Sequence, residues 1–172
     1  MFRYRSIAVI MSTAFVAGCA NYAAYPPLEG TSPVAEAIEA PVPEVIATAI
    51  EWCVAREDFR TQEKPIMFSL PPSMGNGAHA AVAEQLQKDG HASMPMNTDG
   101  IAIRSVRLFG LKAMVDLSVP RGTAPNQLVT LELRSYPFQP WHVVGSNRWR
   151  FNEQQLQQST AEQQQVSAET GS

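Results

Sequence analysis

The segment Lys112–Val119, which reads K-A-M-V-D-L-S-V, decides the fold of this chain. Its apolar residues stand at every second position, with a charged, polar or flexible residue between each pair. Because an extended strand has a side-chain period of two, successive side chains point to opposite faces, so one face is buried and the other is open. The segment therefore predicts a strand of an antiparallel sheet with one covered face. The buried set is Ala113, Val115, Leu117 and Val119.

Further strands are predicted on both sides of this segment. Residues 101–108 are apolar at alternate positions, but the parity changes at Arg104–Ser105, which predicts a β-bulge. Residues 129–134 alternate in the same way. Residues 141–151 give a last strand, broken or bulged near Gly145. These segments extend the antiparallel sheet.

Two amphipathic helices are predicted before the sheet, at Pro43–Phe59 and Asn76–Asp89. A short strand at 64–70 separates them, and Asn76 is the expected N-cap of the second helix. In the first helix, apolar residues recur at three- and four-residue steps, which indicates one buried stripe. Cys53 lies on this stripe, so we expect a buried thiol rather than a reactive one. The stripe consists of Val42, Val45, Ile46, Ala49, Ile50 and Cys53.

The predicted fold class is α+β. We expect a two-layer domain over residues 41–151, with two helices packed on one face of an antiparallel sheet of four to five strands. This arrangement is loosely similar to the cystatin-like and nuclear-transport-factor-2-like folds, an architectural analogy that implies a pocket between helices and sheet. The pocket would be lined by Trp52, Phe68, Leu117 and Trp141. It supports an alternative in which the protein binds a small ligand.

The N-terminal segment has the parts of an export signal. Arg3 and Arg5 precede an apolar run at 6–16, which is about half the ~20 residues that a membrane-spanning helix needs. The run ends in the sequence Val16-Ala17-Gly18-Cys19. An aliphatic residue, two small residues and a cysteine in this order resemble the lipobox of bacterial lipoproteins.

The resemblance implies a lipid anchor on Cys19. The signal peptide, residues 1–18, would be removed by cleavage between Gly18 and Cys19, after the thiol has received a diacylglycerol. Acylation of the new amine, for example by palmitate, gives further chains, and two or three chains anchor a protein stably at roughly 0.8 kcal/mol for each buried methylene. Ala20 is similar to members bound to the outer membrane of Gram-negative bacteria, which implies an outer-membrane location facing the periplasm.

Two segments are expected to flank the domain without folding. Residues 19–40 are rich in Pro and Ala and predict a tether that lets the domain stand off the lipid headgroups. Residues 152–172 are rich in Gln, Glu and Ser and predict a disordered tail. The chain has 13 basic and 16 acidic residues, and loss of Arg3 and Arg5 reduces the basic count to 11, for a net charge near −5. This balance argues against a nucleic-acid partner.

The sequence contains no motif for catalysis, for a metal or for a cofactor. His79, His91 and His142 lack the spacing of metal ligands. Gly75–Gly77 has neither the third glycine nor the Lys-Ser/Thr pair of the phosphate-binding fingerprints. The chain has no G-x-S-x-G sequence either. An envelope hydrolase is therefore the weakest alternative, and no catalytic residue is predicted.

The solvent face of the sheet carries the most distinctive polar set. We interpret it first as a solvated face with cross-strand ion pairs, and second as a platform for an envelope protein or glycan. The expected function is therefore that of a lipid-anchored cell-envelope protein with a non-catalytic structural or protein-interaction role. By strand parity the face presents Arg107, Lys112, Glu132, Arg134, His142, Arg148 and Arg150.

Overall fold

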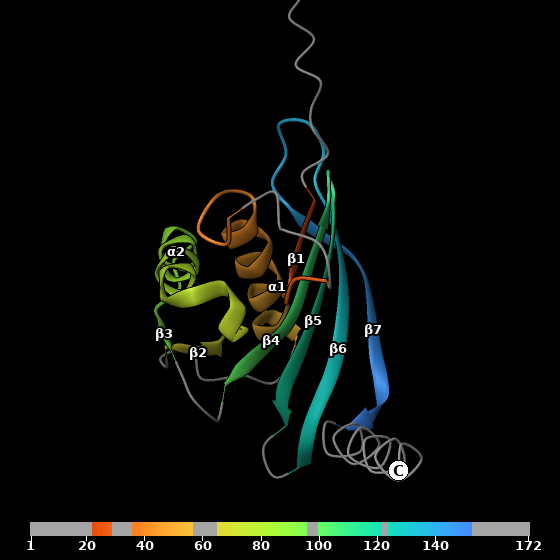
Figure 1. Ribbon diagram of the computed structural model, residues 1–172. Coiled ribbons are helices and arrows are strands. Elements are labelled where there is room, and N and C mark those ends of the chain that lie inside the picture. Colours follow the sequence, from red (N-terminus) through yellow and green to blue (C-terminus); the bar gives the residue numbers. More distant parts are fainter. Residues whose placement is uncertain (1–21, 29–35, 57–64, 96–99, 122–123, 153–172) are drawn as a thin grey trace, which may run out of the picture.

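The computed structural model describes residues 22–28, 36–56, 65–95, 100–121 and 124–152 (Figure 1). The predicted signal peptide, Cys19 and the predicted tail lie outside these residues. The described elements are two α-helices, a 3₁₀ turn and seven strands. In chain order they are β1 (Tyr22–Tyr25), α1 (Val42–Arg56), β2 (Ile66–Ser69), η1 (Pro72–Met74), α2 (Gly75–Lys88), β3 (Ser93–Pro95), β4 (Ile101–Phe109), β5 (Lys112–Arg121), β6 (Ala124–Arg134) and β7 (His142–Asn152).

The α+β class is confirmed, and the sheet differs in size and direction from the prediction. Its strands follow the order β3-β2-β4-β5-β6-β7, and β1 also pairs with β4. Neighbours from β4 to β7 are antiparallel, whereas β2 runs parallel to both β3 and β4. The sheet is therefore mixed and has seven strands. The extra strands, β1 and β3, have only four and three residues, so neither contains enough alternating positions to be recognised from its sequence.

β1 lies inside the segment for which an unfolded tether is predicted. It pairs with β4 from Tyr22 opposite Phe109 to Tyr25 opposite Val106, and Ala23 and Tyr25 belong to the hydrophobic core. The folded part of the chain therefore begins well before the predicted boundary at residue 41. An alanine-rich segment can form a strand here because the free edge of β4 supplies its backbone hydrogen-bond partners.

The other half of the same β4 edge is covered by β2, where Phe68 lies opposite Ile101. Gly100 precedes this junction. A Cβ atom at Gly100 would overlap the carbonyl oxygen of Met67, closer than real Cβ contacts allow. The parallel junction of β2 and β4 therefore requires a glycine at this position.

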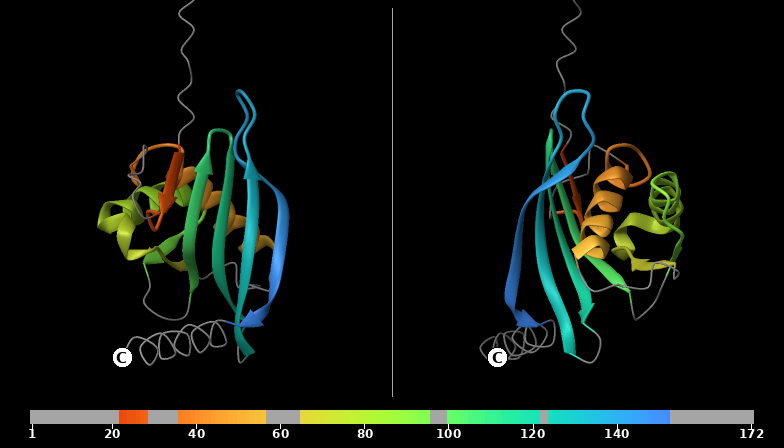
Figure 2. Two further views of the ribbon diagram at one scale, coloured as in Figure 1. Left: turned by 45° about the vertical axis from the view of Figure 1, so that its right-hand side comes forward. Right: turned by 180° about the vertical axis from the view of Figure 1, so that it is seen from behind.

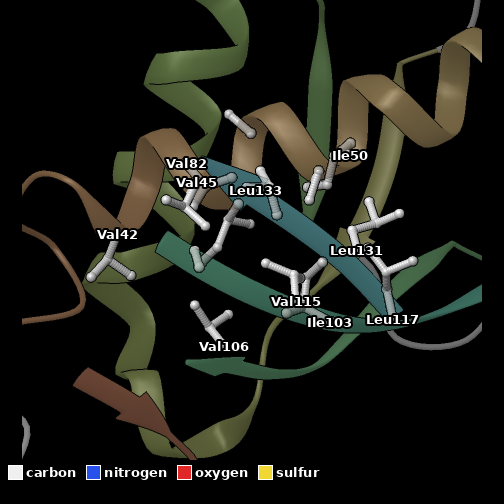
Figure 3. Packing of buried hydrophobic residues seen from close by; sticks show 14 of the residues in the cluster. Val42, Val45, Ile50, Val82, Ile103, Val106, Val115, Leu117, Leu131 and Leu133 are labelled. Carbon is white, nitrogen blue, oxygen red and sulfur yellow. The ribbon is translucent and has the colours of Figure 1, made fainter. Parts of the chain in front are cut away.

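One face of the sheet is covered by α1, which contacts β4, β5, β6 and β7 (Figure 2). α2 contacts α1 and β3 instead, so only the first helix lies across the long strands. The predicted stripe of α1 is buried throughout, including Cys53. Figure 3 shows this core, in which α1 side chains meet those of α2 and of the sheet. Its labelled members are Val42, Val45, Ile50, Val82, Ile103, Val106, Val115, Leu117, Leu131 and Leu133.

The start of α2 differs from the prediction. The helix begins at Gly75, directly after η1, and no side-chain hydrogen bond caps it. Asn76 lies within the first turn and is exposed. The 3₁₀ turn leads straight into the helix, so the chain has already turned before Asn76, and no extended residue is left there to act as an N-cap.

Two irregularities set the faces of the long strands. The predicted bulge in β4 is confirmed, because the register with β5 shifts between Ile103 and Ser105. The predicted irregularity near Gly145 is also confirmed, since Gly145 pairs with Glu132 while Val143 pairs with Leu133. The additional residue, Val144, changes the parity of the rest of β7.

That change of parity alters the predicted solvent face. Arg148 lies opposite the core residue Val129 and therefore on the helix-covered side of the sheet, not on the open side. Trp149 takes the open side instead, where its indole contacts Thr130. The side chain of Arg150 lies outside the described residues.

Candidate functional site

The open face of the sheet carries a network of hydrogen bonds around the Asp116 carboxylate of β5. Its Oδ2 accepts from the Ser105 hydroxyl at 2.5 Å and from the Arg107 guanidinium at 2.7 Å. Its Oδ1 accepts from the Thr130 hydroxyl at 2.6 Å. Thr130 in turn accepts a hydrogen bond from the indole Nε1 of Trp149 at 2.9 Å. We call these five residues the outer-face network.

The β4 bulge is what brings the network together. Ser105 and Arg107 follow the bulge, and Ser105 is paired directly with Asp116, which is paired with Thr130 on its other side. In a regular strand Ile103 and Ser105 would share a face, and Ser105 would point into the core; the extra residue at Arg104 places Ser105 on the open face instead. One inserted residue thus places a polar row across β4, β5 and β6.

Trp149 is fixed by a second irregularity at the far end of β7. Between Gln127 and Val129 the register with β7 shifts. The Gln127 amide fills the interrupted ladder by donating to the backbone carbonyl of Trp149, and the Arg121 guanidinium donates to the Gln127 side-chain oxygen at 3.1 Å. The indole still has 46% of its surface exposed. A large aromatic surface is thus held in place and left open to solvent.

The carboxylate of Asp116 is the centre of the network. Both of its oxygens accept hydrogen bonds, so this one side chain joins β4, β5 and β6. The described residues contain no group of three or more His, Cys, Asp or Glu side chains that could hold a metal ion.

Other members of the predicted polar face form a second row nearer the β4–β5 turn. Lys112 is paired with Arg134, and Arg134 with His142. Arg134 donates to Glu132 at 3.1 Å within the same strand. His142 stacks on Tyr136 at 5.4 Å between ring centroids. The predicted cross-strand ion pairing on this face is present between Arg107 of β4 and Asp116 of β5, whereas the Arg134–Glu132 pair lies within one strand.

The four residues of the predicted ligand pocket are not all brought together. Phe68 and Leu117 are fully buried in the core, and Trp52 is partly buried against it beneath the Arg56 guanidinium. Trp141 directly precedes the His142–Arg134–Lys112 row. Leu117 is five residues further along β5, which corresponds to about 17 Å of strand. Leu117, in the middle of β5, and Trp141 therefore lie at different levels along the strands.

The predicted histidines have ordinary surroundings. His79 stacks on Phe68 at 5.2 Å between ring centroids, and burial lowers the pKa of its imidazole. His91 lies near Glu51 and Asp89. Burial raises the pKa of the Glu51 carboxyl, and Asp89 raises it further by its charge and a hydrogen bond, while His91 acts in the opposite direction.

The sequence reasoning missed most of the outer-face network. It placed Arg107 on the open face but did not connect it with Asp116, and it did not single out Ser105, Thr130 or Trp149. The bulge at Arg104 was visible as a change of parity, so Ser105 could have been assigned to this face. Trp149 could not, because the irregularity predicted near Gly145 could be a break or a bulge, and only a bulge reverses the parity of the residues after it.

Comparisons of the chain with protein-family models, with curated proteins and with solved structures found no match. Neither α1 nor α2 has the length and apolar character that a membrane-crossing helix requires.

Proposed function

We propose that the protein is a lipid-anchored cell-envelope protein that binds a partner protein through the open face of its sheet, without catalysis. The observation that carries the binding role is the outer-face network, which holds the exposed indole of Trp149 in place and links it through Thr130 to the Arg107–Asp116 pair. Exposed Trp and Arg side chains are the residue types that contribute most to protein interfaces.

The anchor rests on the sequence Val16-Ala17-Gly18-Cys19 and the cationic, apolar leader before it. A diacylglycerol on Cys19 with an acylated amine would hold the protein at a membrane surface. Ala20 favours the outer membrane of a Gram-negative cell, with the domain in the periplasm.

The small-ligand alternative has less support. A pocket between helices and sheet would need Leu117 and Trp141 to face a common space, and they lie about 17 Å apart along the strands. The hydrolase alternative is supported by no observation other than the proposed location in the cell envelope.

Palmitate labelling tests the anchor. In a Gram-negative host, the wild-type chain should incorporate labelled palmitate and lose residues 1–18, because the lipidated cysteine is the processing signal. Cys19→Ser should incorporate no label and accumulate as the precursor. Labelling of Cys19→Ser equal to that of the wild type would refute the assignment.

Site-specific crosslinking tests the binding face. A photoreactive phenylalanine analogue at Trp149 should give a discrete crosslinked protein in intact cells. The same analogue at Met94, which is 53% exposed on β3, is the matched control and should not give it. A second variant, Arg107→Glu, should reduce the product at position 149. Equal products at both positions would show that the open face has no specific partner.

A further inference from the structure

Four large apolar side chains gather at one end of the sheet and are open to solvent. Phe109 and Leu111 flank the turn between β4 and β5, and Tyr136 and Phe138 lie in the loop between β6 and β7. Their exposed fractions are 49% for Phe109, 54% for Leu111, 49% for Tyr136 and 107% for Phe138. We call these four residues the end patch. Folding would bury such side chains, so their joint exposure indicates a surface that something else covers.

The two loops of the end patch are joined. The backbone N–H of Ser135 donates to the carbonyl of Leu111 at 3.0 Å, which ties the β6–β7 loop to the β4–β5 turn. Figures 1 and 2 show both connections at the same end of the molecule. The patch is thus one surface made by two loops, held by the strands beneath it.

Phe138 is presented in a costly conformation. Its φ angle is +64°, and the backbone N–H of Gln139 donates to the carbonyl of Tyr136 at 2.9 Å to close the turn. Pro137 stands at the second position and Phe138 at the third, where a type II turn favours glycine. A bulky residue there costs roughly 1–3 kcal/mol, and no burial offsets it. This cost is consistent with a role for the ring outside the fold.

The start of β1 lies beside the end patch. Tyr22 is paired with Phe109, and only Ala20 and Asn21 separate it from Cys19. Three Cα-to-Cα steps span at most about 11 Å of extended chain. A lipid on Cys19 would therefore hold this end of the sheet within about 11 Å of the anchoring residue. The membrane interface is the surface that such a short connection brings to the patch.

The charges next to the patch suit a lipid headgroup layer. Residues 108–113 and 133–143 contain Lys112 and Arg134 and no acidic residue. Arg134 is paired with Glu132, so Lys112 supplies the net positive charge. The acidic residues Glu36 and Glu39 belong to the loop before α1, which lies in the helix layer at the same end of the molecule (Figure 2). Aromatic rings beside a lysine are typical of protein surfaces at a membrane interface.

We propose that the end patch inserts into the headgroup region of the membrane that carries the lipid anchor, so that the sheet stands on the membrane at this end and its open face points sideways. The inference rests on the proposed lipid anchor at Cys19. The domain is then in contact with the membrane and does not stand off from it.

The test places an environment-sensitive NBD group at position 138. Phe138→Cys is labelled with NBD-maleimide in the lipidated full-length chain, since Cys53 is buried and the Cys19 thiol is held in its thioether. The protein is reconstituted into vesicles of phosphatidylethanolamine and phosphatidylglycerol. We expect blue-shifted emission and quenching by nitroxide lipids labelled at headgroup depth. Met94→Cys, labelled in the same way, is the matched control and should report water.

Three further measurements separate the outcomes. Leu111→Cys repeats the test at a second patch position, in case the loop changes when Phe138 is replaced. Vesicles without phosphatidylglycerol should still protect the label. The patch has the net charge of a single lysine, so its binding depends little on anionic lipid. The Phe138→Cys chain produced without residues 1–19, and therefore without the leader and the lipid, should remain in the aqueous phase, because the patch alone binds weakly.

The palmitate label distinguishes failure of the patch from failure of the anchor. If the chain carries palmitate and positions 138 and 111 are as exposed as position 94, the membrane contact is overturned and the anchor stands. If position 138 is protected in native envelope membranes but exposed in protein-free vesicles, a protein covers the patch, and the proposal is again overturned. If the wild-type chain takes up no palmitate, both proposals fall.

Discussion

Asp116 connects β4, β5 and β6 through one carboxylate, and Thr130 extends the connection to Trp149 on β7. Asp116→Ala should lower the free energy of unfolding by about 1–3 kcal/mol, because the mostly buried Thr130 hydroxyl and the Arg107 guanidinium lose their acceptor. Urea denaturation measures this change. Glu84→Ala is the control, since Glu84 forms an exposed pair with Lys88 and should change stability by less than about 0.5 kcal/mol. Equal effects of the two substitutions would contradict the structural role of the network.

Glu51 should make stability depend on pH. Burial and Asp89 raise its pKa in the folded chain above the model-peptide value of 4.5, so the folded state binds this proton more tightly than the unfolded state does. The stability that the protonated Glu51 carboxyl contributes is therefore fully present below pH 4.5. It is lost as the pH rises through the pKa of Glu51 in the folded state. Glu51→Gln stays neutral at every pH, and its stability relative to the wild type should increase from pH 4 to pH 7.

Urea midpoints of both proteins at several pH values provide the measurement. Both proteins retain His79, whose lowered pKa has the opposite effect, so the difference between them isolates Glu51. A difference that stayed constant or decreased with pH would show that the Glu51 carboxyl is not held in its protonated form.

At the level of the strands, the junction of β2 and β4 depends on Gly100. Gly100→Ala should destabilise the fold by about 1–3 kcal/mol, because the new methyl group would overlap the Met67 carbonyl and push β2 away from β4. Gly145→Ala is the matched control, since a Cβ atom there would lie 3.7 Å from its nearest neighbours, which is an ordinary contact. Thermal unfolding of the two variants compares them directly, and a Gly100→Ala protein as stable as Gly145→Ala would be inconsistent with the close approach.

The elements that the sequence predicts well are those with several turns or several alternations. The stripe of α1 and the core face of β5 repeat often enough for their period to be read, and the β4 bulge shows as a change of parity. β1 and β3 are too short to show a period of alternating residues. They form strands because their backbones pair with the edge of a neighbouring strand. The parallel direction of β2 depends on the path of the connection, which no local pattern encodes.

The same limits apply to predicting the candidate site from the sequence. Arg107 was assigned to the open face because the alternation on its side of the bulge is regular. Trp149 was missed and Arg148 was misplaced because Val144 shifts the parity of β7. Residues beyond an irregularity of unknown position can be assigned to a face only once the pairing partner is known.

For the whole molecule, β1 should belong to the cooperatively folded unit. Removal of residues 1–21 is the matched control, because this truncation leaves β1 and its pairing with β4 in place. Removal of residues 1–28 should lower the free energy of unfolding by at least about 2 kcal/mol, since it takes Ala23 and Tyr25 out of the core and uncovers half of the β4 edge. Equal midpoints for the two truncated chains would show that β1 is dispensable.

The two bulges in β7 have a consequence for solubility. β7 is the last strand in the order of the sheet, and within the described part of the chain no strand pairs with its outer edge. A long, regular edge of eleven residues would invite a second molecule to add a strand and begin an aggregate. The register shifts at Val144 and beyond Arg148 interrupt that edge, so a neighbouring chain finds only short runs of correctly spaced hydrogen-bonding groups. At the high local density that the proposed lipid anchor would create on a membrane, this irregular edge would keep adjacent copies apart.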